Sequence, residues 1–294
     1  MGAYSIKDLE QLSGIKAHTI RIWEQRYGIV EPKRTETNIR YYDDFQLKHL
    51  LNIALLSKHG YKISKISRLT PIEFNAAIER LYEQTLLHET DVVLDLNAND
   101  LMVSMIDMDE DKFHRIYENS IKHNGFEKTI TGLIYPFLEK VGILWSIGQI
   151  NPAQEHYMSC LIRQKIIAGI DRLPSVKEGK KFLLFLPSGE HHEIGLLMAY
   201  YLLKKKGCRV FYMGQNLPDD EIKTSVNTVN PDTILTFFVD PAVTNNAAQM
   251  VRYFKTFGSS FNILIATRPN PELEDLKDDQ THFLTGIKQL DDFI

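Results

Sequence analysis

The chain has 294 residues with 34 Lys and Arg against 38 Asp and Glu, so its formal net charge is −4. Hydrophobic residues make up 44% and charged residues 24%, a globular mixture that excludes a wholly disordered or fibrous chain. The sequence lacks an apolar run long enough for a membrane span, a signal-peptide core, and the cysteines of a disulfide scaffold, since only Cys160 and Cys208 occur. We therefore expect a soluble cytoplasmic protein with two or three domains and no membrane partner.

The charge is distributed unevenly along the chain. Residues 1–70 carry a net charge of +5, which leaves −9 for the remainder. A basic end on an acidic protein favours a module that binds a polyanion. A mildly basic solvated surface would explain the charge equally well, so the sequence of this end has to decide.

Two short helices are predicted near the N-terminus. Residues 5–12 have apolar side chains at helical spacing behind Ser5, which can cap a helix. Gly14 permits a turn, and residues 17–27 predict a second helix. Two helices joined by a tight turn form a helix-turn-helix, whose second helix can enter a major groove. A short basic hairpin over residues 32–42 would form a wing that grips the DNA backbone.

This segment resembles the MerR family of transcription regulators. The resemblance rests on TIRIWEQRYG at 19–28, followed by Pro32-Lys33-Arg34 and Arg40-Tyr41-Tyr42, and it runs from about Tyr4 to Leu69. It implies a winged helix-turn-helix that binds double-stranded promoter DNA as a dimer and affects RNA polymerase only indirectly. The helix face and the resemblance together give the expected DNA-binding residues His18, Thr19, Arg21, Arg34, Arg40 and Tyr42. We expect Trp23 to pack in the core.

The middle of the chain predicts a small helical bundle. A helix is expected over 72–87, and the polar residues Asn97, Asn99 and Asp100 mark a linker or a helix start. Four further helices are expected from the apolar spacing, with polar breaks at 109–110 and 124–125. They cover residues 99–108, 111–123, 125–147 and 151–173.

Three residues of this bundle form a candidate site. Trp145 is followed, after nine residues, by Glu155 and His156. These two residues stand in the first turn of a predicted helix. Asn151 can cap that helix, and Gln154 occupies the reciprocal capping position. Trp145 would end the preceding helix, so the three side chains can converge. A core tryptophan beside a solvated Glu-His pair is the simpler reading of the spacing alone.

The same spacing resembles the helical bundle of the light-responsive, cobalamin-binding MerR-type repressors of carotenoid genes. There the bundle caps the upper face of adenosylcobalamin. The resemblance implies that Trp145 packs on the adenosyl group and that Glu155 and His156 hydrogen-bond around it. Members with the light switch usually have a His directly after that Trp, whereas this chain has Ser146. A hydroxyl is a poor cobalt ligand beside imidazole, so the usual bis-His photoproduct is not expected from this position.

The last third of the chain predicts a doubly wound α/β domain. Apolar runs suited to buried parallel strands alternate with helical patterns, and ligands in such sheets bind beyond the carboxyl ends of the strands. Strands are expected at 181–187, 208–213, 233–239, 262–266 and 281–284, with helices at about 193–205 and 219–229.

The first strand ends in a second candidate site, with the spacing Glu190-x-His192-x-x-Gly195. Glu190 can accept a hydrogen bond from the ring nitrogen of His192 that is not used for ligation, which fixes the tautomer. Gly195 lets a bulky ligand approach the start of the helix. A solvated polar loop with two histidines and a zinc site remain as alternatives, although zinc usually requires at least three close protein ligands.

This motif resembles the signature of base-off cobalamin-binding domains, and the resemblance covers about Lys180 to Ile294. It implies that His192 is the lower axial ligand of cobalt, while the adjacent His191 is out of register. It also places Thr236 near the nucleotide tail. Ala266 and Thr267 replace the usual Gly-Gly pair, and their side chains would narrow the tunnel for the dimethylbenzimidazole tail.

These predictions combine into a multidomain α and α/β protein. We expect a winged helix-turn-helix in residues 1–75, a helical bundle in 76–176, and a doubly wound parallel-sheet cobalamin domain in 177–294. The expected function is a non-enzymatic repressor whose DNA binding and self-association, as a dimer or tetramer, are controlled by adenosylcobalamin and light, with methylcobalamin as a second candidate cofactor. The alternatives are the cobalamin carrier of a methyltransferase and a regulator whose altered pocket has lost cobalamin and serves protein association.

Overall fold

The structure is a computed structural model that describes residues 3–35, 38–85, 90–146, 151–258 and 260–294. The chain divides into two compact units, Met1–Cys160 and Leu161–Ile294. Within the described ranges, no helix combines the length with the apolar character that crossing a bilayer requires. Each unit is described by itself.

The N-terminal helices begin and end where local chemistry fixes them. Ser5 caps α1 (Ile6–Ser13): its Oγ accepts from the Asp8 N–H at 3.3 Å, while the Asp8 carboxylate accepts from the Ser5 N–H at 2.6 Å. This reciprocal capping box satisfies two amides that a helix start leaves unpaired. Gly14 ends α1 with a φ of 73°, and α2 (Ala17–Tyr27) follows with the predicted bounds.

A two-stranded wing follows the second helix. Strands β1 (Lys33–Arg34) and β2 (Arg40–Tyr41) pair antiparallel, so the predicted hairpin is confirmed. The remaining helices of this segment are α3 (Asp44–Lys58), α4 (Ile63–Ile66) and α5 (Pro71–Thr85). The predicted extension of α5 to residue 87 lies outside the described residues. Helix α3 supplies the core, since six of its side chains are buried.

The bundle differs from the prediction at its first helix. Its elements are α6 (Thr90–Asp107), α7 (Glu110–Thr129), the π-helical turn η1 (Ile130–Ile134), α8 (Tyr135–Ser146) and α9 (Pro152–Asp171). Asn97, Asn99 and Asp100 lie in the middle of α6, so reading them as a linker or helix start was wrong. Packing overrides their weak helical preference, because Leu94 and Leu101 are buried on either side of them.

The predicted break at residues 124–125 is a kink inside a longer helical run. Gly125 has φ 74° and ψ 171°, a conformation outside the helical region that glycine adopts without steric cost. The chain becomes helical again at once and reaches α8 through the π turn η1, in which each hydrogen bond spans one residue more than in an α-helix.

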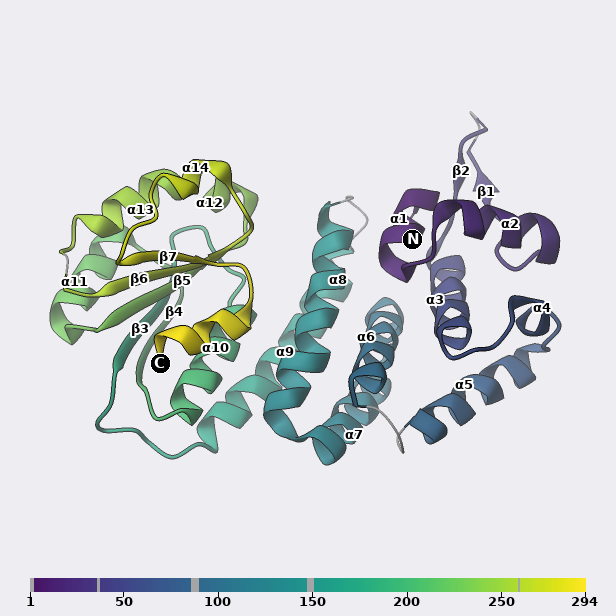
Figure 1. Cartoon of the computed structure of the whole chain (residues 1–294), viewed down its shortest axis with the longest axis horizontal. Helices are drawn as coiled ribbons and strands as arrows, with labels where there is room; N and C mark the ends of the chain where they lie inside the picture. The colour runs from purple at the N-terminus through teal and green to yellow at the C-terminus, as the bar shows by residue number, and fades with distance from the viewer. Residues whose placement is uncertain (1–2, 36–37, 86–89, 147–150, 259) are drawn as a thin grey trace. The chain divides into compact units, whose positions relative to one another are not determined.

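The second unit is an α/β domain with one five-stranded sheet (Figure 1). The strands are β3 (Lys181–Pro187), β4 (Arg209–Leu217), β5 (Thr233–Phe238), β6 (Asn262–Thr267) and β7 (Thr281–Leu284). All neighbours pair parallel, in the order β4-β3-β5-β6-β7. The helical segments are α10 (Ile194–Lys205), α11 (Asp219–Val229), α12 (Pro241–Asn245), α13 (Ala247–Lys255), α14 (Pro271–Glu274) and η2 (Ile287–Phe293).

The two faces of the sheet carry separate cores because strand side chains alternate. Leu184, Leu235 and Leu264 pack against α10 and η2, and we call this cluster the α10-side core. Leu183, Ile234 and their neighbours pack against α11, α12 and α13 on the opposite face. Strand order reverses between β3 and β5, so their carboxyl ends form the switch point at which such sheets bind ligands.

Candidate functional site

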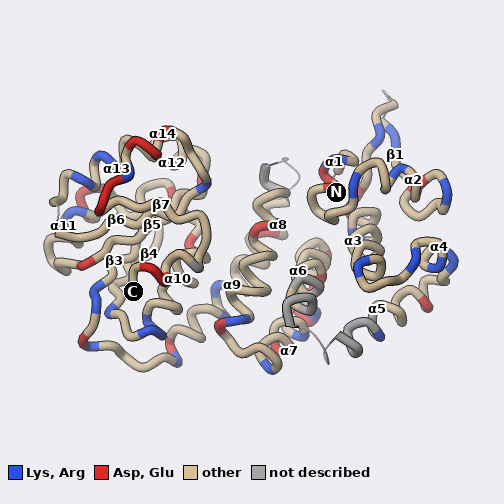
Figure 2. Tube along the Cα trace, in the orientation of Figure 1, with Lys and Arg blue, Asp and Glu red and all other residues tan. Residues whose placement is uncertain are grey.

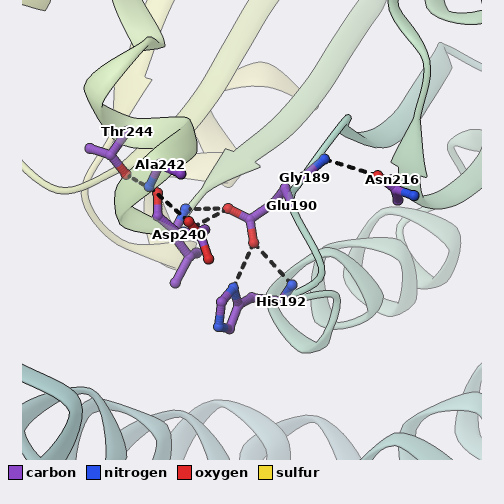
Figure 3. A network of polar contacts seen from close by, with 8 residues as sticks. Gly189, Glu190, His192, Asn216, Asp240, Ala242 and Thr244 are labelled. Atoms are coloured by element: carbon purple, nitrogen blue, oxygen red, sulfur yellow. Dashed lines mark hydrogen bonds and ion pairs between the residues drawn. The ribbon is translucent and has the colours of Figure 1, made fainter. Parts of the chain in front are cut away.

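The loop that leaves β3 is organised around a buried carboxylate (Figure 3). Glu190 is fully buried, and its Oε1 lies 3.0 Å from the His192 N–H and 2.6 Å from the His192 Nδ1. Its Oε2 accepts from the backbone N–H groups of Val239 at 2.7 Å and Asp240 at 2.8 Å. One side chain therefore joins the loop after β3 to the loop after β5, at the switch point of the sheet.

The hydrogen bonds keep this carboxylate ionised. Burial by itself would raise the pKa of Glu190, but the bonds from the His192 ring and from the three backbone N–H groups outweigh burial and lower the pKa to about 2. An ionised carboxylate only accepts, so the His192 Nδ1 carries the proton. The Nε2 edge of the ring points away from Glu190 (Figure 3), and in this tautomer Nε2 has the lone pair that a metal requires.

Asn216 ties the same loop to the end of β4. Its Oδ1 accepts from the Gly189 N–H at 2.9 Å (Figure 3). Its backbone N–H donates to the Glu190 carbonyl at 3.1 Å. Asn216 has a φ of 55°, a left-handed conformation that asparagine tolerates better than most residues. Sequence reasoning missed this residue, because no short motif connects residues 189 and 216.

Glu193 fixes the start of α10 on the other side. Its carboxylate lies 2.5 Å from the Arg163 Nε and accepts from the Tyr212 hydroxyl at 2.8 Å. Burial and this hydrogen bond raise the pKa of Tyr212 above its ordinary value, so the hydroxyl remains a donor. Glu193 was also missed, although it directly follows His192, because its partners are distant in sequence.

Gly195 and Thr236 lie in different surroundings. A Cβ at position 195 would stand 2.7 Å from the Cε1 of Phe237, so the glycine is required by the close approach of that ring. Thr236 is buried, and its Oγ1 has no hydrogen-bond partner among the described residues. Adjacent strand residues point to opposite faces, so Thr236 faces away from the side on which Phe237 meets Gly195. The structure therefore does not bring Thr236 and Gly195 together.

The Glu-His pair of the bundle lies at the start of α9, as predicted. The Glu155 carboxylate accepts from the Ser159 hydroxyl at 2.5 Å and lies 3.4 Å from the His156 Nδ1. The His156 side chain is 78% exposed, which leaves it accessible to a ligand. The backbone of Trp145 and Ser146 ends α8, but their side chains lie outside the described part of the chain, so their convergence with Glu155 stays a prediction.

The start of α9 also holds one correction. Asn151 caps it as predicted, because its Oδ1 accepts from the Ala153 N–H at 3.0 Å. Gln154, which was expected to cap reciprocally, instead donates to the Ile106 carbonyl at 2.5 Å. That carbonyl belongs to the last turn of α6, where backbone acceptors lack partners within the helix. The amide therefore satisfies a neighbouring helix end.

The predicted DNA face is largely exposed. His18 and Arg21 on α2 and Arg40 on the wing are exposed, and Thr19 is half-buried. Arg34 is also exposed and donates to the Asn38 Oδ1 at 2.7 Å, a bond within the wing. Figure 2 shows the basic residues of α2 and the wing. Such side chains are suited to phosphate and base contacts.

Tyr42 departs from this group because it is fully buried. Its hydroxyl hydrogen-bonds to the carboxylate of Glu24 in α2. This position favours a role in holding the wing against the second helix over direct contact with DNA. Trp23 is half-buried, between the expected core position and the surface.

Three exposed basic residues extend the charged surface beyond the predicted set. Lys62, Lys65 and Arg68 lie in and around α4, where the trace in Figure 2 is coloured blue for basic residues. Their charge was visible in the sequence. Their one-sided exposure was not, because α4 is too short for a clear helical period.

Comparison with known proteins finds two family models that match separate segments of the chain. Residues 4–71 match the MerR HTH family of regulatory proteins, and residues 98–168 match a B12 binding domain. The chain is 28% identical to the HTH-type transcriptional repressor CarA of Myxococcus xanthus over 239 residues, which cover 80% of this chain and 76% of CarA. It is 25% identical to the repressor CarH of the same organism, over 79% of this chain and 77% of CarH.

Among solved structures, the fold is similar to the monomethylamine corrinoid protein of Methanosarcina barkeri. The TM-score is 0.56 at 10% sequence identity, and the match covers 68% of this chain and 96% of that protein. The likeness supports the fold described above, in which helices are combined with a parallel sheet. The chain therefore contains a MerR-type helix-turn-helix segment and a B12 binding domain, and it is homologous to the Myxococcus repressors CarA and CarH over about 80% of its length.

Proposed function

We propose that the protein is a transcriptional repressor whose DNA binding is controlled by cobalamin. The observation that carries the proposal is the Glu190–His192 pair on the loop after β3, in a chain whose N-terminal residues match MerR regulators. The names of CarA and CarH, both repressors, support the direction of regulation. The DNA-binding residues are His18, Thr19, Arg21, Arg34 and Arg40, with Tyr42 as a buried support.

The donor set fits the lower side of a corrin ring. Cobalamin carries its own metal in a ring of nitrogens, so it needs one axial imidazole from the protein. His192 can supply that imidazole because Glu190 holds the opposite ring nitrogen and sets the tautomer. A zinc site would need at least three ligands, and the described residues contain no group of three or more His, Cys, Asp or Glu placed to hold a metal ion.

The bound form is proposed to be adenosylcobalamin, which supplies a cobalt–carbon bond that light can break. Glu155 and His156 would bind around the adenosyl group by resemblance, with Trp145 packed on it. Ser146 gives no imidazole at the position that usually ligates cobalt after illumination. Methylcobalamin, which offers nothing for Trp145 to stack on, is the weaker candidate.

Control of DNA binding follows from linkage between cofactor and assembly. A ligand shifts an equilibrium only by its differential affinity for the two states. If adenosylcobalamin binds the assembled dimer or tetramer more tightly than the monomer, the cofactor strengthens DNA binding by holding several winged helices together. Loss of the adenosyl group would then weaken repression, and RNA polymerase would be affected only through access to the promoter.

The fold likeness to a corrinoid protein leaves one competing function, a cobalamin carrier for a methyltransferase. Such a module is not itself the catalyst, and it needs no DNA-binding segment. The match of residues 4–71 to MerR regulators favours the repressor. Specific, cofactor-dependent binding to promoter DNA would separate the two functions, because a carrier would bind cobalamin without it.

The direct test is titration of the full chain with adenosylcobalamin, methylcobalamin and hydroxocobalamin, followed by absorbance. We expect a base-off spectrum with a histidine ligand, and we expect His192→Ala to lose most of the affinity. His191→Ala is the matched control because it removes the neighbouring imidazole. Equal retention of cobalamin by the two variants would contradict the assignment of His192.

A further inference from the structure

The contact between Gly195 and Phe237 stands where a cobalamin tail would need room. Phe237 is half-buried in β5 and packs on the α10-side core. A Cβ at position 195 would lie 2.7 Å from the Phe237 Cε1 and 3.0 Å from its Cδ1. Gly195 is not among the residues with positive φ, so the backbone does not demand a glycine. The close approach of this aromatic ring is therefore the physical reason for a glycine in this structure.

A protein imidazole on cobalt forces the tail of cobalamin to move. The dimethylbenzimidazole base hangs from the lower face of the corrin, and it gives up the lower coordination position when His192 takes it. The displaced base and its nucleotide must then pass the loop of His192 on one face of the sheet or the other.

On the face towards α12, the hydrogen bonds of the Glu190 carboxylate hold the loop. Glu190 accepts from the N–H groups of Val239 and Asp240 there, and the side chain of Val243 lies 3.8 Å from where a Cβ on Gly189 would be. Opening this route would leave a buried, ionised carboxylate without its partners, which is costly.

On the face towards α10, apolar side chains rather than hydrogen bonds occupy the space next to the loop. Phe237 fills the space beside Gly195, and its pair in β6, Ala266, packs into the same core. A change of rotamer in Phe237 would open this route without breaking a backbone hydrogen bond. The ring and the tail therefore compete for the space next to the first turn of α10.

We propose that Phe237 is a specificity-determining residue that disfavours corrinoids with a bulky nucleotide tail. This inference rests on the proposed binding of cobalamin at His192. A corrinoid without the tail binds with Phe237 in place, whereas full cobalamin binds only after the ring has been displaced from the α10-side core. The chain thus discriminates between corrinoids by the presence of the nucleotide tail on the lower face of the corrin ring.

The test compares aquocobinamide, which has no nucleotide tail, with hydroxocobalamin in absorbance titrations of the full chain. Wild type should bind cobinamide at least as tightly as cobalamin. Phe237→Ala should shift the ratio of the two dissociation constants towards cobalamin by about tenfold or more, the order expected when burial of an aromatic ring no longer opposes binding. Phe237→Leu should give a smaller shift in the same direction and keeps an apolar side chain in the core.

Phe211→Ala is the matched control, because Phe211 is another half-buried strand phenylalanine that packs on the opposite face of the sheet. It should leave the ratio unchanged, and thermal unfolding of all variants checks that each is folded. An unchanged ratio in both Phe237 variants, with cobalamin still held by His192, overturns this inference alone. Binding of neither corrinoid to any variant overturns the proposed function as well.

Discussion

Two carboxylates, one in each unit, hold a turn in the same way but in opposite surroundings. Glu10 in α1 accepts from the Lys16 Nζ at 2.9 Å and from the Ala17 N–H at 3.0 Å, and so fixes the turn into α2. Glu190 accepts from an imidazole and three backbone N–H groups. The Glu10 side chain is 30% exposed, whereas Glu190 is fully buried.

The comparison teaches that the surroundings of such a carboxylate decide how much it contributes to stability. Water can replace the partners of Glu10, and exposed ion pairs contribute little to stability. The carboxylate of Glu190 is fully buried, so removing it leaves three N–H groups and the His192 ring without the acceptor that the fold provides. We expect the turn of the DNA-binding segment to tolerate substitution and the turn of the His192 loop not to.

The largest expected effect is that of Glu190→Ala. It removes the buried acceptor of three backbone N–H groups and the partner of the His192 ring, so we expect a loss of about 3 kcal/mol in the free energy of unfolding. Urea denaturation of the full chain, followed by circular dichroism, measures this loss. A change below about 1 kcal/mol would show that the loop relaxes and that burial does not set the difference between the two carboxylates.

The contribution of Glu190 to stability should also be visible in the wild-type chain as the pH is lowered. The pKa of Glu190 is lowered from 4.5 to about 2, so between these values the unfolded chain binds more protons than the folded one. Stability from Glu190 is complete above about pH 4.5 and is lost as the pH falls towards 2, by about 3 kcal/mol in total. Urea denaturation as a function of pH should show a steeper acid loss for wild type than for Glu190→Gln. Parallel curves would contradict the assignment.

Gly195→Ala tests whether tight packing extends from Glu190 to the start of α10. The added Cβ would stand 2.7 Å from the Phe237 ring, and such overpacking costs about 1–3 kcal/mol. The double variant with Phe237→Ala should recover most of that cost. A thermodynamic cycle from urea denaturation measures the coupling, and additive effects would mean that the two residues do not meet.

A smaller effect, on DNA rather than on stability, is expected at the exposed wing. Arg40→Ala should weaken binding to promoter DNA by about tenfold. It should also reduce the slope of log K against log salt concentration by about one, as expected for the loss of one phosphate contact. Arg252→Ala is a suitable control because Arg252 is exposed on α13 in the other unit. Fluorescence anisotropy at several salt concentrations measures both, and an unchanged slope would exclude Arg40 from the DNA interface.

The smallest effect is expected for Glu10→Gln. The hydrogen bond from Lys16, and then that from the Ala17 N–H, lower the pKa of Glu10, but the pair is exposed and screened by salt. We expect only a slight decrease in melting temperature, which disappears in high salt. A decrease comparable to that of Glu190→Ala would remove the distinction between the two turns.

The sequence predicted elements well wherever local chemistry sets their bounds. Ser5 and Gly14 delimit α1 because a capping box and a left-handed glycine need only neighbouring residues. The spacing from Glu190 to His192 likewise predicted a carboxylate–imidazole pair, which the structure contains.

The sequence failed where a distant contact decides. Asn97 reads as a break but lies inside α6, and Gln154 bonds to another helix, because packing outweighs local preference. Tyr42 is buried with its hydroxyl bonded to Glu24, which is 18 residues away. The roles of Asn216 and Phe237 require knowing which strand ends and helix starts meet, and that information comes only with the sheet order.

The π turn at Ile130–Ile134 sets the rotational phase of everything that follows it in α8. A π turn accommodates one residue more than a regular helix, and each residue turns a helix by about 100°. If the same residues formed a regular α-helix instead, the following positions would be rotated by about that angle, so that Val141 and Leu144 would leave the core. The burial of Val141 and Leu144 is therefore encoded in the π turn that precedes α8.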